Sequence, residues 1–261
     1  MKIGFIGTGN MATAMIKGII NSELVGKSDI YVSDINEKQL SAFDGLNTST
    51  DNNFVVKNSD YIFITVKPQF YDDVLNNITN AENKIFITVA PGITTKYIKQ
   101  KLGKNTKIIR TMPNTPALIG EGVTAVYYPD SLTKEELSFS EKIISSFSLP
   151  FEMEESLLDP VISVSGSSPA YSYMFINAIA KSGERQGMNY ETALRMAAKT
   201  VLGAAKMLLL SEDTPEILIE KVCSKGGTTI EAVNHLNQNN FDKIIDAAMQ
   251  KCTDRAIELK K

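Results

Sequence analysis

The feature that most constrains this chain is a glycine turn within its first dozen residues. A short apolar run, Ile3–Ile6, leads into Gly7-Thr8-Gly9-Asn10-Met11-Ala12, and the residues that follow have helical spacing. A glycine turn between a strand and a helix is typical of a dinucleotide-binding βα unit. Gly7 permits the turn, Gly9 lets backbone approach a pyrophosphate, and the small side chain of Ala12 allows the helix to pack closely on the strand.

The start of this helix is the expected pyrophosphate site, because unpaired N–H groups and the helix dipole favour negative charge there. We therefore predict that the cofactor contacts Gly7, Gly9, Asn10 and Met11. The alternative is a glycine turn that only packs a βα unit and binds no ligand.

Strand-like and helix-like segments alternate from residue 1 to about residue 160. Such alternation predicts an α/β fold of Rossmann type, with a doubly wound, mostly parallel sheet. We expect strands at 3–6, 30–33, 61–66, 85–89, 107–111 and 124–128, and helices at 10–22, 37–43, 70–78, 94–102 and 134–147.

Beyond Pro160 the strand-like runs stop and the spacing is helical. We therefore predict two domains, a dinucleotide-binding domain at 1–160 and an all-α domain at 161–261 that binds substrate and forms a dimer. Its expected helices are 170–186, 190–210, 215–222, 229–236 and 241–259, and the apolar run at 161–164 is either a last strand-like run or the start of a helix.

The helix predicted at 190–210 is apolar around most of its circumference. A helix of this kind is buried, and a helical unit of about a hundred residues has little room to bury it alone. We expect it to pack against a second copy of the chain, as a homodimer or a ring of dimers. The alternative is a helix wrapped by its own four neighbours.

Asp34 follows the second predicted strand, as the acidic residue of a dinucleotide fold often does. A carboxylate there accepts hydrogen bonds from ribose hydroxyls and repels a 2′-phosphate, and no arginine lies in 33–39. The cofactor is thus NADH or NADPH, with a tilt to NADH. The alternative is that Asp34 caps the following helix.

Three successive loops, at 66–69, 90–92 and 112–116, follow strands that should end at the same edge of the sheet, where ligands bind in open α/β folds. Small residues or prolines stand in all three loops and again in 165–171, Ser-Gly-Ser-Ser-Pro-Ala-Tyr, at the entry of the first C-terminal helix. That segment is either a helix cap or room for a nicotinamide ring or substrate. The cofactor-binding residues predicted here are Val66, Lys67, Pro68, Ala90, Gly92, Asn114, Pro116 and Ser165.

The segment Ser224-Lys225-Gly226-Gly227-Thr228-Thr229-Ile230-Glu231 predicts an anion site. Thr228 and Glu231 have the spacing of a capping box, and two glycines free the backbone just before it. The N–H groups at this helix start suit a carboxylate, beside which Thr229 would place a hydroxyl. The alternative is a capped helix that follows a flexible loop.

Composition excludes several other classes of function. The formal net charge is −3 and no long basic run is present, so we expect a small-molecule substrate and neither nucleic acid nor a membrane as partner. The chain has a single histidine, His235, and two distant cysteines, Cys223 and Cys252. These residues predict no metal site and reduced thiols in a cytoplasmic protein.

Five segments carry a resemblance to a known family. They are GTGNMA at 7–12, VKP at 66–68, MPNTP at 112–116, SGSSPAY at 165–171 and SKGGTTIEAV at 224–233. In order and spacing they resemble the pyrroline-5-carboxylate reductases, over essentially the whole chain. The chain departs from the family's usual pattern at Lys225, where proline is usual, at Pro91, where alanine is commoner, and at Ser168, where glycine is frequent.

The resemblance implies an oxidoreductase that reduces 1-pyrroline-5-carboxylate to L-proline with NAD(P)H, the last step of proline biosynthesis. It implies that Thr229 is catalytic and donates a hydrogen bond to the ring nitrogen. It also implies that the N–H groups of Gly226, Gly227 and Thr228, together with Ser224, hold the carboxylate. Two alternatives stay open: a β-hydroxyacid-dehydrogenase-like enzyme, whose lysine is absent from 166–177, and a non-catalytic dinucleotide-binding regulator.

Overall fold

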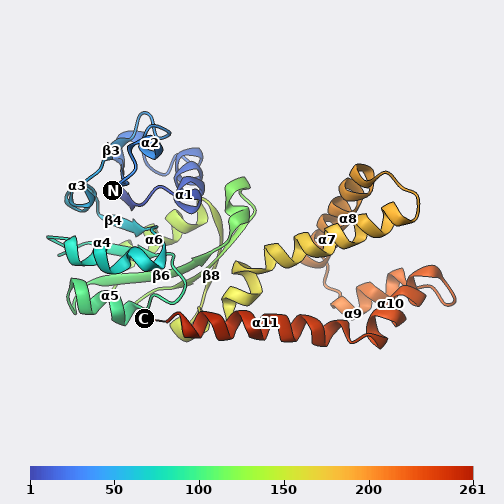
Figure 1. The fold of residues 1–261 in the computed structure, drawn as a ribbon. Helices are drawn as coiled ribbons and strands as arrows, with labels where there is room; N and C mark the ends of the chain where they lie inside the picture. The colour runs from blue at the N-terminus through green and yellow to red at the C-terminus, as the bar shows by residue number, and fades with distance from the viewer. Residues whose placement is uncertain (261) are drawn as a thin grey trace. The chain divides into compact units, whose positions relative to one another are not determined.

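The computed structural model describes residues 1–260, and within them the strands form one eight-stranded sheet. The strand order is β3-β2-β1-β4-β5-β6-β7-β8, in which all neighbours from β3 to β6 run parallel, β7 runs antiparallel to β6, and β8 runs parallel to β7 (Figure 1). The strands are β1 (Ile3–Ile6), β2 (Ile30–Ser33), β3 (Asn47–Ser49), β4 (Tyr61–Ile64), β5 (Ile85–Thr88), β6 (Lys107–Pro113), β7 (Gly122–Tyr127) and β8 (Ser148–Glu152).

Apolar side chains on both faces explain why the central strands are buried throughout. Along β1, Phe5 belongs to the apolar cluster on one face of the sheet and Ile6 to the cluster on the other. The rings of Phe5 and Phe63 stack with centroids 4.7 Å apart, which fixes the register between β1 and β4. Helices cover both faces, as a parallel sheet requires.

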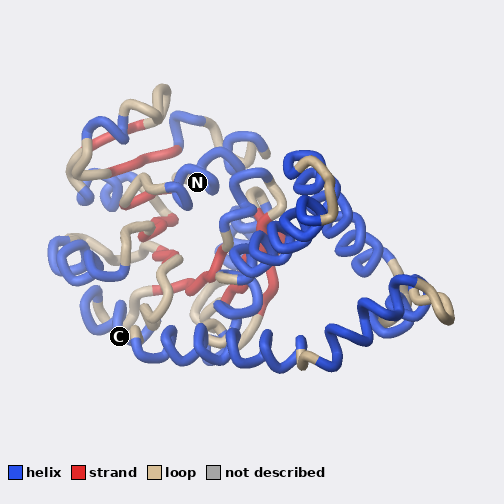
Figure 2. The backbone as a smooth tube through the Cα atoms, turned by 45° about the vertical axis from the view of Figure 1, so that its right-hand side comes forward, coloured by secondary structure: helices blue, strands red, loops and turns tan. Residues whose placement is uncertain are grey.

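The chain divides into two compact units. The first contains residues 1–167 and 252–260, and the second contains Ser168–Lys251. Figure 2 shows that every strand belongs to the first unit, whereas the second consists of helices and their connections. The helices of the first unit are α1 (Asn10–Asn21), η1 (Lys27–Asp29), α2 (Glu37–Leu40), α3 (Asn52–Asn58), η2 (Pro68–Phe70), α4 (Tyr71–Asn77), α5 (Thr95–Leu102), η3 (Thr115–Ile119), α6 (Lys134–Ser145), η4 (Glu155–Leu157) and η5 (Ile162–Gly166).

The second unit is formed by α7 (Ser168–Arg185), α8 (Tyr190–Leu210), α9 (Pro215–Val222), α10 (Thr228–Gln238) and most of α11 (Phe241–Glu258). The end of α11 belongs to the first unit, where Ala256 joins Met112 and Leu158 in a small apolar cluster. No helix among residues 1–260 is both long enough and apolar enough to cross a membrane.

The predicted fold class is confirmed, with a Rossmann-type sheet in the first part of the chain and helices in the second. The compact units divide after Ser167, later than the predicted domain boundary at residue 160, and residues 252–260 return to the first unit. The boundary between functional domains therefore stays a prediction.

Candidate active site

The glycine turn leaves an open, uncapped helix start. Gly7 has φ +96°, and a side chain there would meet Val66 at 2.9 Å, so both space and backbone conformation require glycine. Nothing lies within 4 Å of the position that a Cβ on Gly9 would occupy. Gly9 is also the N-cap of α1, and no side chain caps the helix. Free N–H groups beside open space fit the diphosphate of a dinucleotide.

Asp34 supports this turn directly. Its Oδ2 accepts hydrogen bonds from the backbone N–H and the hydroxyl of Thr8, both at 2.8 Å. Its Oδ1 accepts from the N–H of Asn36 at 2.9 Å. The cap of α2 is Asn36, which accepts from the N–H of Lys38, so the alternative that Asp34 caps this helix is wrong. Asp34 holds the loop, and it retains lone pairs for a ribose hydroxyl.

The three loops predicted to bind cofactor follow β4, β5 and β6. These strands are parallel neighbours, so their carboxyl ends share one edge of the sheet. Within the first unit the predicted residues differ in exposure: Gly9, Asn10 and Lys67 are exposed, Met11, Asp34, Val66, Pro68 and Pro116 are half-buried, and Gly7, Ala90, Gly92, Asn114 and Ser165 are buried. They surround one edge, although a direct role for each remains a proposal.

The loop predicted at 112–116 is partly strand. β6 continues through Pro113, because Met112 and Pro113 pair with β7. The short helix η3 follows, and its Ala117 joins the apolar cluster that contains Ala12 and Met15 of α1. This packing holds the end of β6 beside the helix that begins at the glycine turn.

Asn114 is occupied by structural hydrogen bonds. Its amide nitrogen donates to the carbonyl of Ser165 at 3.1 Å, and its amide oxygen accepts from the N–H of Val123 at 2.9 Å. Ser165 lies in η5, a π-helical turn in which the N–H of Ser167 donates to the carbonyl of Ile162 at 2.7 Å. Such turns often stand at functional sites. Asn114 therefore joins the segment around Ser165 to the sheet edge.

A buried hydroxyl network at the same edge was not predicted from the sequence. The hydroxyl of Tyr71 donates to the carbonyl of Ile64 at 2.8 Å and lies 2.8 Å from the hydroxyl of Thr88. Thr111 donates to the carbonyl of Thr88 at 2.9 Å. Burial raises the pKa of Tyr71, so the phenol stays neutral. The signal in the sequence is weak: a threonine ends β5 at Thr88, and another follows the apolar residues of β6 at Thr111.

Thr65 completes the support of the glycine turn. Its hydroxyl donates to two backbone carbonyls, with the oxygen 2.9 Å from the carbonyl oxygen of Ile6 and 2.6 Å from that of Gly7. This threonine follows β4 directly, and it fixes the end of β1 to the neighbouring strand. It too was absent from the predicted residues.

The predicted anion loop in the second unit forms a tight turn before α10. Gly226 has φ +71°, a conformation that favours glycine. The N–H of Gly227 donates to the carbonyl of Ser224 at 3.0 Å, so it is already used by the turn. A Cβ on Gly227 would lie 2.3 Å from the hydroxyl oxygen of Ser224, which leaves no room for a side chain. Lys225 is exposed at the tip.

The capping box predicted for Thr228 and Glu231 is wrong. α10 begins at Thr228 itself, so the N-cap is Gly227, which has no side chain to accept a hydrogen bond. A capping box needs the threonine one position earlier, outside the helix. The first N–H groups of α10 therefore have no side-chain cap, and they lie beside the half-buried Thr229.

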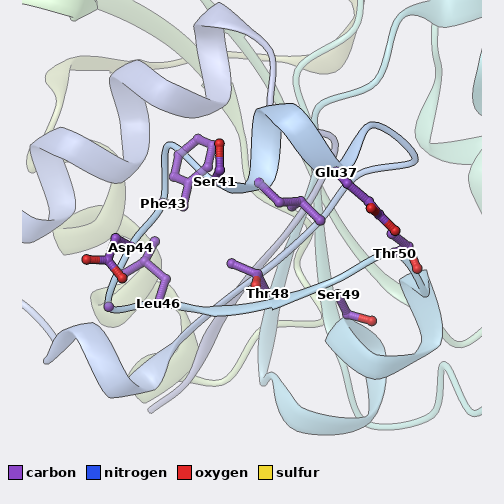
Figure 3. Close-up of a pocket in the computed structure, with 10 residues that line it drawn as sticks. Glu37, Ser41, Phe43, Asp44, Leu46, Thr48, Ser49 and Thr50 are labelled. Carbon is purple, nitrogen blue, oxygen red and sulfur yellow. The ribbon is translucent and has the colours of Figure 1, made fainter.

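One open pocket of the first unit lies away from these residues. It has a volume of about 580 Å³ and runs along the edge strand β3 (Figure 3). Its lining includes the carboxylates of Glu37 and Asp44 and no cationic side chain. It contains none of the predicted site residues, and its charge does not suit a phosphate.

Two family models match consecutive parts of the chain. The model for pyrroline-5-carboxylate reductase dimerisation matches residues 155–259. The model described as NADP oxidoreductase, coenzyme F420-dependent, matches residues 2–92.

Individual relatives are similar over the full length. The pyrroline-5-carboxylate reductase of Escherichia coli strain K12 is 39% identical over 265 residues, covering 100% of this chain and 98% of that protein. A solved pyrroline-5-carboxylate reductase from Coxiella burnetii is 32% identical with a TM-score of 0.92, covering 100% of this chain and 98% of that one. The Plasmodium falciparum enzyme, solved with NADP bound, is 26% identical with a TM-score of 0.92 and the same coverage.

Full-length identity of this level, together with the motifs and the fold, does not favour the alternative of a β-hydroxyacid dehydrogenase. The chain belongs to the pyrroline-5-carboxylate reductase family.

Proposed function

We propose that this protein reduces 1-pyrroline-5-carboxylate to L-proline with a nicotinamide dinucleotide, the last step of proline biosynthesis. The observation that carries the proposal is a pair of helices, α1 and α10, that each have a glycine as the N-cap residue and no side-chain cap. In contrast, a threonine or asparagine side chain caps the N-terminus of α5, α6 and α8. One open helix start suits a diphosphate, and the other suits a carboxylate.

The cofactor half of the proposal uses the edge of the sheet. Gly7, Gly9, Asn10 and Met11 hold the diphosphate, and Asp34 accepts from the adenosine ribose. The nicotinamide end lies among the loops of Val66, Lys67, Pro68, Ala90, Gly92, Asn114, Pro116 and Ser165. When bound, the dinucleotide supplies the hydride that reduces the imine carbon. We propose a preference for NADH, because the carboxylate of Asp34 repels a 2′-phosphate.

The substrate half of the proposal uses the start of α10. With the N–H of Gly227 used by the turn, the N–H groups of Thr228 and Thr229 are the stronger donors to the carboxylate, supported by Gly226 and Ser224. The hydroxyl of Thr229 donates to the ring nitrogen. Its role is to orient the imine and to assist the proton at that nitrogen.

Reduction of an imine does not require a strongly acidic or basic side chain beside the substrate. A protonated imine is already electrophilic, whereas the reduction of a carbonyl also moves a hydroxyl proton through a placed acid or base. The single histidine, His235, is exposed on α10. The binding groups thus contribute mainly orientation of two planar rings.

The dimerisation family model supports a homo-oligomer. We propose a homodimer, or a ring built from such dimers, with a small-molecule substrate and no nucleic acid or membrane partner. We place the protein in the cytoplasm, where Cys223 and Cys252, both unpaired here, stay reduced.

Steady-state kinetics with 1-pyrroline-5-carboxylate as the sole oxidant tests this function. Oxidation of NADH with stoichiometric formation of L-proline is the expected result, and equal concentrations of NADH and NADPH report the preference. Cofactor binding without turnover would instead favour a dinucleotide-binding regulator. Turnover with β-hydroxyacids alone would favour that class of dehydrogenase.

A further inference from the structure

An ion-pair cluster that the proposed chemistry does not use lies beneath the loop that follows β5. Its centre is Arg110 on β6, whose side chain is only 1% exposed. The guanidinium pairs with the carboxylate of Asp159, and its Nη1 lies 3.6 Å from Oε1 of Glu155. A buried charge with these partners is held in one place, because moving away from both carboxylates would leave it uncompensated.

Glu155 connects this cluster to one end of the loop. Its two carboxylate oxygens accept from the N–H and the hydroxyl of Thr95, at 2.8 and 2.7 Å. Thr95 is the first residue of α5, and the loop of residues 89–94 ends there. Arg110 therefore helps to fix the end of the loop through Glu155.

Asp159 connects the same cluster to the middle of the loop. Its second carboxylate oxygen lies 3.0 Å from the ammonium of Lys260, which follows α11. The backbone there lies against Gly92: a Cβ on Gly92 would be 2.5 Å from the carbonyl oxygen of Leu259 and 3.2 Å from the nitrogen of Lys260. Gly92 has φ +74°, so conformation and contact both require glycine. We call this contact of Leu259 and Lys260 with Gly92 the tail contact.

We propose that Lys260 is a positioning residue for the cofactor, acting through the tail contact on the loop after β5. The inference rests on the proposed function, which assigns Ala90 and Gly92 to the nicotinamide end of the site. Lys260 is held by Asp159, Asp159 by Arg110, and the backbone before Lys260 sets the position of Gly92. Loosening this chain of contacts lets the loop move, and a small displacement of a binding loop weakens orientation of the ring.

Lys260 is the member of the cluster that can be changed without opening the core. Its side chain is 45% exposed, whereas Asp159 is 3% exposed. The variant Lys260→Met keeps most of the side-chain volume and removes the charge. The matched control is Arg255→Met, which removes the exposed ion pair with Glu258 near the end of α11, the helix that Lys260 follows.

The experiment measures the Kd of NADH and NADPH by fluorescence titration without substrate, followed by steady-state kinetics. We expect Lys260→Met to weaken cofactor binding about threefold to tenfold, with the KM of the imine and the melting temperature nearly unchanged. Lys260→Arg keeps the positive charge and should have the wild-type Kd for the cofactor. Arg255→Met should have the wild-type Kd as well. An unaltered Kd in Lys260→Met, or an equal loss in Arg255→Met, overturns the inference.

A second variant guards against a general loss of structure. In Asp159→Asn the partner of Lys260 is gone, so adding Lys260→Met should weaken cofactor binding no further. Full additivity of the two changes would contradict the tail contact. The binding assay contains no imine, so a wild-type protein that binds cofactor but makes no proline refutes the proposed function and leaves this inference standing.

Discussion

At the scale of single residues, the role of Asp34 decides how the glycine turn works. The sequence suggested either a ribose ligand or a helix cap, and the structure shows a carboxylate bonded to Thr8 in the turn itself. Support of the loop aids any dinucleotide, whereas repulsion of a 2′-phosphate disfavours NADPH alone. The two contributions can therefore be separated by measuring both cofactors.

Asp34→Asn should weaken NADH binding about tenfold, because a neutral amide oxygen replaces the carboxylate that accepts the hydrogen bonds of Thr8. NADPH binding should change less, because removal of the charge relieves repulsion of its phosphate. Titration of both cofactors checks this. The control is Asp44→Asn, an exposed carboxylate in the connection that precedes β3, which should alter neither value. A NADH-to-NADPH ratio that stays constant would remove Asp34 from specificity.

Thr229→Ala should lower kcat about 10- to 100-fold, because the ring nitrogen loses its hydrogen-bond donor in the transition state. The Kd of the cofactor should remain close to the wild-type value. Thr229→Ser keeps the hydroxyl and should recover most of the turnover, as kinetics and titration together would show. Equal losses of turnover and cofactor affinity in Thr229→Ala would assign Thr229 to structure instead.

At the scale of elements, periodicity predicted most helices and strands because apolar runs and caps are local signals. The strand β1 and the helices α8 and α9 have the predicted bounds. The strand β3, Asn-Thr-Ser, was missed because it has no apolar residue and pairs only at the sheet edge. The helix α3 was missed because its single turn of apolar residues, between two polar ends, resembles a loop.

The candidate site shows the same division between local and distant signals. Glycine turns are local, and the sequence predicted both of them. The bonds of Asn114 to Ser165 and of Thr65 to Gly7 join residues distant in the chain, so no local pattern reports them. The predicted capping box was wrong by one residue, because the spacing of Thr228 and Glu231 does not determine where α10 begins.

The helix α6 provides a test of element stability. Glu136 accepts from the N–H of Thr133 in a capping box and from Lys107 at 2.6 and 2.7 Å. Burial raises the pKa of Glu136, but the hydrogen bonds from Lys107 and Thr133 outweigh it and bring the pKa below its ordinary value of 4.5. A lowered pKa means that the carboxylate adds stability above the ordinary value and loses it as pH falls through the folded value.

Glu136→Gln should therefore reduce the free energy of unfolding by about 1 kcal/mol at pH 7. The difference from the wild type should shrink as the pH falls below the ordinary value and through the lowered folded value, because the wild-type carboxyl then becomes protonated as well. Urea unfolding at several pH values measures both effects. Glu135→Gln, at the exposed neighbouring position, is the control that should change little. A difference that stays constant with pH would assign the effect to side-chain packing.

At the scale of the whole molecule, one chain leaves much of the apolar surface of α8 exposed. The sequence predicted that α8 would be covered by a second subunit, with its own neighbours as the alternative. Among the described residues, α8 buries only Ala193 and Ala197, and Leu209 and Leu210 are 82% and 87% exposed. Its own neighbours therefore do not wrap it, which contradicts the alternative. Apolar exposure on this scale marks an interaction surface.

A charge on this surface should separate the subunits. Leu209→Lys places an ammonium where we expect apolar packing, and a lysine near a helix C-terminus does not disturb the helix itself. We expect the dissociation constant of the oligomer to rise about 100-fold. Analytical ultracentrifugation over a range of concentrations measures it. The control Leu149→Lys changes another exposed leucine, on β8 of the first unit. It should leave the mass of the oligomer in solution unchanged. If Leu209→Lys keeps the wild-type oligomer while Leu149→Lys dissociates it, the contact between subunits lies on the sheet and α8 is not its centre.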